Sequence, residues 1–173
     1  SIKLASARAG NVIGGGDWAT DRLIPDLFRS VDNNKILCVR SPQAVRPWQH
    51  VLDPLAGYLI LAEKLVIHGK NFAEAWNFGP EQSGSQTVSW VLDRFKKFIN
   101  VSWEVENTKK QHETTLLKLD ISKAKSKLGW APRWSLETAI DNTIEWYQAF
   151  KENKKMQEFS IKQIKLYENF ESK

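Results

Sequence analysis

The chain has 173 residues, of which 42% are hydrophobic and 26% are charged, and this composition is typical of a globular protein with a sizeable core. No apolar run approaches the roughly 18 residues that a membrane-spanning helix needs, and the N-terminus lacks the pattern of a secretory signal, so we expect neither membrane insertion nor secretion. The 25 basic and 20 acidic side chains give a net charge of +5, which suits an anionic partner, although the charges are interspersed rather than clustered.

Cys38 is the only cysteine, so no internal disulfide is possible, and its apolar neighbours predict a small buried side chain. This cysteine usage is typical of a reducing, cytoplasmic compartment. His68 and His112 have no carboxylate or cysteine at metal-ligand spacing, so we expect no metal site. Because Ser1 opens a segment that has the character of a domain interior, we expect the chain to be a piece of a longer protein.

The first half of the chain predicts two strands and two helices. Pro25 is tolerated because it falls in the first turn of a helix, and Asp53 with Pro54 is typical of an N-cap followed by the first helical residue. Gly69 is expected to end the second helix. The expected elements, in chain order, are a strand over residues 3–9, a glycine-rich loop over 10–21, a helix over 24–33, a strand over 36–40, a turn over 41–44 and a helix over 55–67.

The second half predicts shorter strands and amphipathic helices. Thr87, Asp120 and Ser135 each precede a segment of helical periodicity and are expected to cap it, and Gly129 follows the end of the middle one. The expected elements are a buried strand over 75–79, a helix after Thr87, a half-exposed strand over 101–106, a polar loop over 107–115, a short strand over 116–119, a short helix over 121–128, a longer helix after Ser135 and a helical tail over 156–170. We therefore expect a mixed α/β fold with helices around small sheets.

Arg46 lies in the most informative stretch, residues 45–54. A guanidinium group is a rigid fork of donors that fits phosphate or carboxylate with two parallel hydrogen bonds. Pro47 and Trp48 would hold the stem of the arginine and limit its contact with water. This pattern predicts an anion site at Arg46. The alternative is that Arg46 pairs with an internal carboxylate and that Trp48 belongs to the core.

Four segments, residues 8–18, 22–25, 46–53 and 75–80, together resemble the C-terminal half of the nucleotide-sugar 4,6-dehydratases, which are members of the extended short-chain dehydrogenase/reductase superfamily. Residues 119–124 and 128–134 extend the resemblance almost to the end of the chain. The loop over 14–18 and the Arg-Pro-Trp-Gln-His string over 46–50 are most similar to members that act on CDP-glucose. The resemblance implies a single substrate-binding domain over residues 1–173, in which 1–16 are a remnant of the cofactor domain and 154–173 form a tail helix.

The resemblance also implies a reaction, in which the full-length enzyme uses NAD to convert CDP-glucose to CDP-4-keto-6-deoxyglucose and water. In such enzymes the dinucleotide loop, the Tyr-x-x-x-Lys pair and the acid–base groups lie in the N-terminal half, which has no match here. We therefore expect no catalytic residue, no NAD and no activity in this chain alone. The implied parent is a cytoplasmic homo-oligomer of deoxysugar biosynthesis, for polysaccharides such as O-antigen, that binds neither nucleic acid nor membranes.

Two patterns in the chain mimic cofactor motifs. Gly14, Gly15 and Gly16 lack the G-x-G-x-x-G spacing and follow no complete βαβ unit, so we interpret them as a loop. Tyr147 and Lys151 match Tyr-x-x-x-Lys, but Tyr147 continues the apolar stripe of the long C-terminal helix. We interpret that tyrosine as a core residue.

The resemblance assigns substrate-binding roles to six residues. Arg46 would bind the diphosphate, and Asn11 would donate to the phosphate or sugar, although Asn11 in a structural loop role is the alternative. Residues Arg22 and Leu23 correspond to the stretch that lies against the nucleotide, and residues 36–40 correspond to the strand whose backbone edge meets the base. His50 would line the site, but related dehydratases often have tyrosine there. Asn77 would face the site from a strand end, with a structural amide as the alternative.

Two further hypotheses for the function stay open. The same fold also serves nucleotide-sugar epimerases and decarboxylases. A nucleic-acid-binding module would instead use basic charge with exposed aromatic rings, for which Lys109 and Lys110, the lysines at 123, 125 and 127 and the eight tryptophans are the candidates. Those three lysines alternate with other residues in a short helix, which more simply indicates a solvated face.

Overall fold

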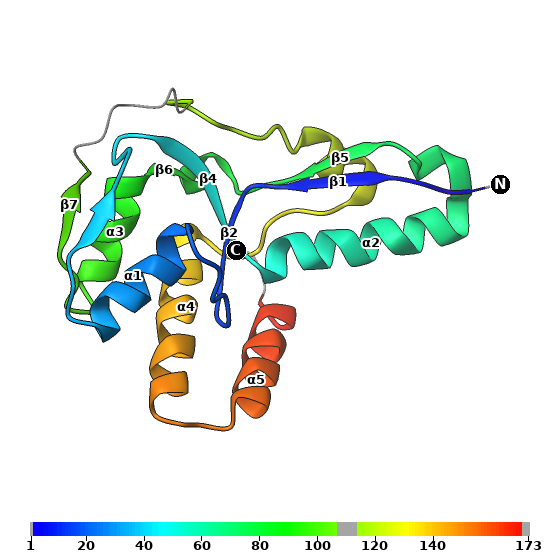
Figure 1. Ribbon diagram of the computed structural model, residues 1–173. Coiled ribbons are helices and arrows are strands. Elements are labelled where there is room, and N and C mark those ends of the chain that lie inside the picture. Colours follow the sequence, from blue (N-terminus) through cyan, green and yellow to red (C-terminus); the bar gives the residue numbers. More distant parts are fainter. Residues whose placement is uncertain (1, 107–113, 171–173) are drawn as a thin grey trace.

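The structure of the protein is a computed structural model that describes residues 2–106 and 114–170. It contains three small sheets with helices around them (Figure 1), as the sequence predicts. The strand orders are β1-β5, β2-β4-β6 and β3-β7. No helix in the described ranges is long and apolar enough to cross a membrane.

One region of the molecule, which we call the β1–β5 region, is built on a two-stranded parallel sheet. The long helix α2 runs beside this sheet (Figure 1), and its Gly57 packs so closely on the Phe78 ring that an added Cβ would lie 2.3 Å from a ring carbon. The elements are β1 (Ser6–Ala9), α2 (Leu52–His68), η1 (Gly69–Phe72), β5 (Ala75–Phe78) and the π-helical turn η3 (Ala124–Leu128). The core of this region is formed by Leu61, Trp76, Phe78, Ile121, Ala124, Leu128 and Trp130.

The other region, which we call the cleft region, has the larger core. Strand β4 is central, because β2 pairs with it in parallel and β6 pairs with it antiparallel. The elements are β2 (Asn11–Ile13), α1 (Leu23–Asp32), β3 (Leu37–Val39), β4 (Val45–His50), η2 (Gln82–Gly84), β6 (Ser85–Thr87), α3 (Val88–Lys96), β7 (Trp103–Val105), α4 (Leu136–Lys151) and α5 (Met156–Glu168). Its fully buried side chains include Leu27, Val91, Leu92, Phe95 and Ile140.

Gly10 joins the two regions within a single extended stretch. The chain leaves the β1–β5 sheet at Ala9 and enters the β2–β4 pairing at Asn11. The Gly10 N–H donates to the Phe78 carbonyl at 3.2 Å, while a Cβ on Gly10 would lie 2.3 Å from the carbonyl oxygen of Pro47. Only glycine allows the backbone to approach β4 this closely.

Helix ends largely follow the predicted signals. The side chains of Thr87 and Ser135 accept hydrogen bonds from the Trp90 and Thr138 amides, and so cap α3 and α4. Gly129 follows η3 in the left-handed conformation with φ 67°. The Asp120 carboxylate accepts from the Ser122 amide at 2.9 Å, just before η3.

Three local expectations require correction. Asp53 does not cap α2, because the helix begins one residue earlier and Asp53 is fully buried inside it. Cys38 is exposed, since it alternates along β3 with the buried Leu37 and Val39. Residues 116–119 form only an isolated bridge, between Leu116 and Val45. Most of the loop expected over 107–115, with His112 and Lys109, lies outside the described residues.

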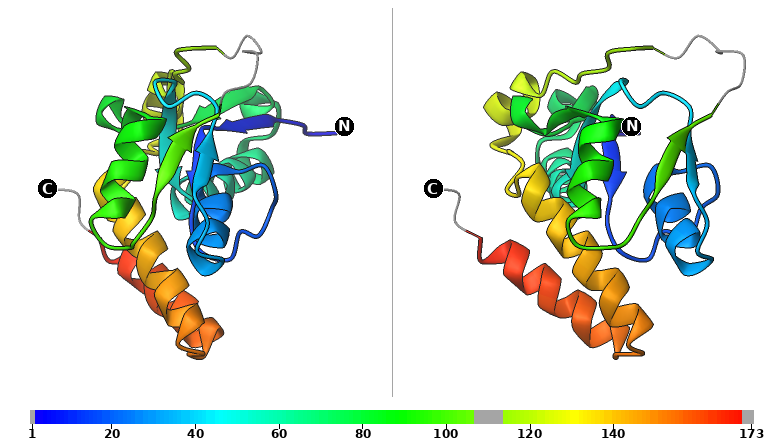
Figure 2. Two further views of the ribbon diagram at one scale, coloured as in Figure 1. Left: turned by 60° about the vertical axis from the view of Figure 1, so that its left-hand side comes forward. Right: turned by 90° about the vertical axis from the view of Figure 1, so that its left-hand side faces the viewer.

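The C-terminal tail docks on the body of the protein as expected. Helices α4 and α5 lie side by side as a hairpin (Figure 2), and Gln163 donates to the Asn142 carbonyl at 2.8 Å. The far end of α5 is held by Tyr167, whose hydroxyl donates to the Asp53 carboxylate at 2.9 Å. The same carboxylate accepts from the Arg133 amide at 2.7 Å. Asp53 therefore fastens three distant segments, which explains its burial.

Candidate functional site

Two adjoining cavities of about 460 and 430 Å³ form one cleft in the cleft region. They share Asn11, Asp21, Leu23 and Trp48 as walls. The first cavity adds Arg22 and the start of α1, and the second adds β3 and Arg46. Four of the six residues that the resemblance assigns to substrate, Asn11, Arg22, Leu23 and Arg46, are thus brought to one place by the fold.

The start of α1 forms one wall of the cleft. Arg22 precedes the helix without a side-chain cap, and Leu23 and Ile24 are its first two residues. The first N–H groups of a helix have no partner within the helix, and its N-terminus carries partial positive charge. These amides therefore offer hydrogen bonds to an anion in the first cavity.

Strand pairing brings Asn11 and Arg46 together. Asn11 is in register with Trp48 in the parallel β2–β4 pair, and Arg46 precedes Trp48 by two residues, so all three project from the same face of the sheet. The Arg46 guanidinium donates to the carbonyls of Val45 at 3.0 Å and Thr114 at 2.7 Å. Trp48 is oriented by its indole N–H, which donates to the Gln86 carbonyl at 3.0 Å.

Strand β3 presents a backbone edge to the second cavity. Leu37 and Val39 direct their N–H and C=O groups to β7, as shown by the bonds from the Leu37 amide to Ser102 and from the Glu106 amide to Val39. Because successive residues of a strand alternate, the N–H and C=O of Cys38 point to the other edge. Among the described residues no strand pairs with that edge, and Cys38 lines the cavity.

The loop before α1 is held by charged side chains. Arg22 pairs with Asp17 at 3.1 Å and stays mostly exposed. Arg29 donates to the carbonyls of Trp18 and Ala19 at 3.1 and 2.9 Å, and also contacts Asp26. Gly15 lies under the Trp146 indole, where a Cβ would be 2.0 Å from a ring carbon. These contacts define the shape of the loop that borders the cleft.

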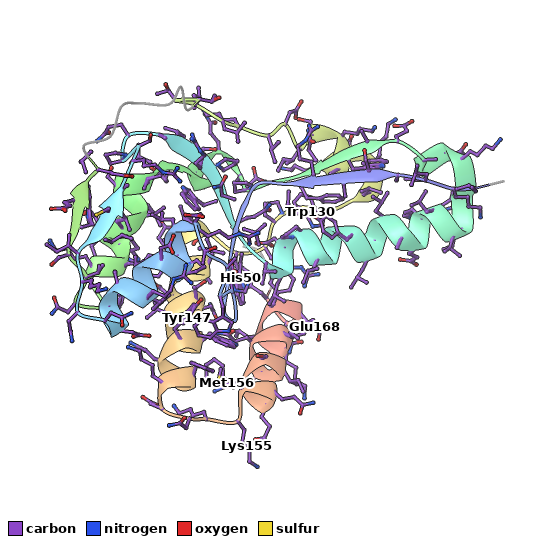
Figure 3. The ribbon with its side chains drawn as sticks, viewed as in Figure 1. His50, Trp130, Tyr147, Lys155, Met156 and Glu168 are labelled. Carbon is purple, nitrogen blue, oxygen red and sulfur yellow. The ribbon has the colours of Figure 1, made fainter. Side chains whose placement is uncertain are left out.

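His50 and Asn77 line neither cavity. His50 is buried near the start of α2 (Figure 3), 4.7 Å from the Trp134 ring, and burial lowers its pKa to about 3. Its Nδ1 accepts from the Leu52 amide at 3.3 Å. Asn77 lies in β5, donates to the Asp120 carbonyl at 3.2 Å and accepts from Arg8 at 3.4 Å. In this chain both side chains make structural contacts instead.

Tyr147 is a core residue, as the sequence predicts. It lies on α4 (Figure 3), its ring stacks on Phe28 with centroids 3.6 Å apart, and its hydroxyl donates to the Asp17 carbonyl at 2.7 Å. Burial raises the pKa of Tyr147 to about 12, which opposes the formation of a phenolate base. Lys151, its partner in the motif, forms an ion pair with Asp32.

Asp21 is a wall residue that the sequence analysis missed. It lines both cavities and has a left-handed φ of 58°, which is uncommon for a residue other than glycine. The only signal in the sequence was its position at the end of a glycine-rich loop. Among the described residues no group of three or more His, Cys, Asp or Glu side chains is placed to hold a metal ion.

The sequence is similar to that of a known nucleotide-sugar enzyme. The chain is 47% identical over 151 residues to CDP-glucose 4,6-dehydratase of Salmonella typhimurium, a match that covers 86% of this chain and 42% of that protein. The resemblance predicted from the motifs is thereby confirmed. The chain spans less than half the length of this relative. No family model matches the chain.

Solved structures show the same fold. A UDP-glucose 4-epimerase from Stenotrophomonas maltophila, determined with NAD and formylated UDP-arabinopyranose, matches with TM-score 0.73 at 18% identity, over 86% of this chain and 48% of that chain. A dTDP-glucose 4,6-dehydratase from Bacillus anthracis in complex with NAD matches with TM-score 0.65 at 21% identity, over 87% and 46%. The chain therefore has the fold of about half of each of these enzymes, which confirms the expected mixed α/β fold.

Proposed function

We propose, from the homology of this chain to CDP-glucose 4,6-dehydratase, that it is the sugar-nucleotide-binding part of such an enzyme. The complete enzyme would convert CDP-glucose to CDP-4-keto-6-deoxyglucose and water with NAD as cofactor. Residues 1–173 would form its substrate-binding domain, with residues 1–16 as the last strand and loop of the cofactor domain. The complete enzyme would be a cytoplasmic homo-oligomer.

One observation supports this proposal most strongly, namely that the α1 N-terminus, Asn11 and Arg46 surround one cleft. A diphosphate needs several donors that converge, and cationic and helix-terminal donors are the strongest for that purpose. Arg46 would bind the diphosphate with its fork, and Asn11 would add a neutral donor without a second buried charge. The backbone amides of Leu23 and Ile24, at the start of α1, would complete the contacts with the diphosphate.

The open edge of β3 would receive the base. The peptide of Cys38 offers one donor and one acceptor on that edge, which matches the alternating polar atoms along a pyrimidine. Trp48 lines both cavities and would help to position the nucleotide across them. In this arrangement Arg22 lies against the nucleotide, whereas His50 and Asn77 line neither cavity.

The two patterns that mimic cofactor motifs make structural contacts in the described residues. The Tyr147–Lys151 pair is part of the packing between α4 and α1, and the Gly14–Gly16 turn packs on Trp146 and Val51. We therefore propose that NAD and the catalytic groups belong to the rest of the complete enzyme. The isolated chain should show no formation of 4-keto product from CDP-glucose and NAD above background, and turnover would contradict this assignment.

A nucleic-acid-binding role receives no support from the described surface. Lys123 and Lys127 both contact Glu74, and Lys125 pairs with Glu81 at 2.7 Å. The ring beneath Lys123 is that of Trp76, which is 1% exposed and unavailable for base stacking. An epimerase shares the fold, but the 47% identity to a dehydratase favours dehydration.

Replacement of Arg46 tests the binding role in the complete enzyme. Arg46→Ala should weaken CDP binding by about 1.5–3 kcal/mol, the usual range for hydrogen bonds to charged groups. Arg46→Lys should recover only part of the loss, because a point charge does not reproduce the fork. Calorimetric titration with CDP provides the affinities.

A thermal melt of each variant separates binding from folding. We expect Arg46→Ala to stay folded, because Trp48 and the sheet pairing of β4 do not depend on the guanidinium. Arg94→Ala is a matched control, since Arg94 pairs with Asp141 on α4, away from the cleft, and should leave CDP affinity unchanged. Loss of folding in Arg46→Ala, with intact affinity in the folded remainder, would assign Arg46 to an internal ion pair instead.

A further inference from the structure

We propose that Asp26 selects the nucleotide base, by accepting a hydrogen bond from the exocyclic amine of cytosine. The inference rests on the proposed function of the cleft and adds a specificity-determining residue to it. Asp26 lies in the first turn of α1 and lines the cavity of about 430 Å³ into which Cys38 directs its free backbone groups. The candidate residue and the expected base position therefore share one cavity.

The Asp26 carboxylate is held in a fixed orientation. One oxygen, Oδ1, contacts the Arg29 guanidinium, which is itself anchored to the carbonyls of Trp18 and Ala19. Within the described residues the second oxygen, Oδ2, has no hydrogen-bond donor. The side chain is 34% exposed, so this oxygen is accessible to a ligand in the cavity. A preoriented acceptor loses little conformational freedom when it binds a ligand.

Pyrimidines differ at the position that this acceptor would read. Cytosine carries an amine that donates there, whereas uracil and thymine carry a carbonyl oxygen that accepts. A carboxylate therefore stabilises cytosine and repels the other two bases, which is discrimination by attraction and repulsion together. The Cys38 peptide offers a donor and an acceptor that suit either kind of base, so the choice between them requires a side chain.

Two other carboxylates line the same cavity and serve as internal controls. Asp21 and Glu106 make no side-chain hydrogen bond within the described residues, so neither has an orientation fixed by a partner. Of these three carboxylates, only that of Asp26 contacts a guanidinium within the described residues. If base selection required merely a negative cavity, all three residues would contribute equally.

The test compares CDP with UDP and dTDP by calorimetric titration of the complete enzyme. We expect the unmodified enzyme to prefer CDP by about tenfold or more, the effect of one well-placed base contact. Asp26→Asn should reduce that preference at least about tenfold, since the amide also donates to a carbonyl oxygen. Asp21→Asn and Glu106→Gln should leave the preference unchanged.

The outcomes distinguish this inference from the function on which it rests. If the unmodified enzyme binds neither CDP nor UDP, the proposed function is wrong and the inference fails with it. If CDP binds but Asp26→Asn keeps the full preference for CDP, only the role of Asp26 is wrong. Asp26→Ser is the second variant, with thermal melts of both, and an unchanged preference in either folded variant overturns the inference.

Discussion

The cleft region and the β1–β5 region bury the apolar faces of their helices to different extents. In the cleft region α1, α3 and α4 each bury one apolar face in a common core. In the β1–β5 region α2 is apolar on nearly every side but buries only the face that includes Gly57 and Leu61. Helices that are apolar all round are usually buried all round. Burial in this chain is thus more complete around the cleft than around α2.

The exposed side of α2 shows the difference most clearly. Leu55, Leu59, Ala62 and Val66 follow one another at helical spacing along the exposed side, and Leu59 and Val66 are 73% and 74% exposed. The sequence of α2 thus specifies a helix, although only one face of that helix packs against other described residues. Substitutions should therefore have very different costs on the two faces of α2, and slightly different costs in the two cores.

The largest effects are expected in the two cores. Phe95→Ala in the cleft region and Phe78→Ala in the β1–β5 region both remove fully buried rings, and should each lower the free energy of unfolding by about 3–5 kcal/mol. Phe78→Ala should fall at the lower end, because a smaller core collapses more easily around a void. Denaturant unfolding of the 173-residue chain measures both. A larger cost for Phe78→Ala would reverse our ranking of the two cores.

Acid should lower the stability of the protein through His50, which lies at the boundary between the two regions. Its pKa is lowered by burial to about 3, so the unfolded chain, with a pKa near 6.5, binds the proton first. The stability that the neutral imidazole contributes is complete above pH 6.5 and is lost as the pH falls toward 3, by as much as about 5 kcal/mol.

His50→Gln should flatten this part of the pH profile. Burial raises the pKa of the Asp53 carboxyl, which gives a slope of opposite sign, because that contribution is present below its ordinary pKa and is lost as the pH rises through the raised value. Unfolding by urea at a series of pH values resolves the two. An unchanged acid slope in His50→Gln would show that His50 is not the responsible group.

The contact that fastens α5 to the start of α2 should have an intermediate effect. Tyr167→Phe removes the donor to the Asp53 carboxylate and should cost about 1.5–3 kcal/mol, the range for a hydrogen bond to a charged group. Tyr58→Phe is the matched control, since no hydrogen bond of the Tyr58 hydroxyl is present within the described residues. Equal losses in the two variants would show that the Tyr167 hydroxyl bond is not specifically stabilising.

The smallest effect is expected on the exposed face of α2. Leu59→Ser should change the stability of this chain by less than about 0.5 kcal/mol, whereas Leu61→Ala on the buried face of the same helix should cost about 2–5 kcal/mol. Thermal melts of the two variants measure the contrast. A large loss of stability in Leu59→Ser would mean that the exposed face of α2 is covered within this chain.

The sequence predicted most elements because its local signals agree with the fold. The caps at Thr87 and Ser135 act through hydrogen bonds to residues three positions away, so they are readable without tertiary structure. The prediction that Asp53 caps α2 was wrong for the same reason, since Asp followed by Pro is a strong local signal for a helix start. Here tertiary bonds to Arg133 and Tyr167 outweigh it.

The cleft was only partly predictable. The resemblance identified Asn11 and Arg46, and their convergence follows from the register of two parallel strands, which no local pattern encodes. Cys38 was expected to be buried because its neighbours are apolar, but a strand alternates its faces and places this side chain opposite theirs. His50 shares a motif with Arg46, yet their side chains lie in different environments at the two ends of β4.

The passage of the backbone through Gly10 has a mechanical consequence. Asn11 in the cleft and Ala9 in the β1–β5 sheet are separated by one residue, Gly10. Its amide donates to the Phe78 carbonyl, and the Pro47 carbonyl oxygen leaves no room for a side chain on it. No flexible segment absorbs a displacement between them. A shift of the β1–β5 sheet by even a fraction of an ångström is therefore transmitted as strain to Asn11 and, through its strand pairing, to the backbone that carries Arg46.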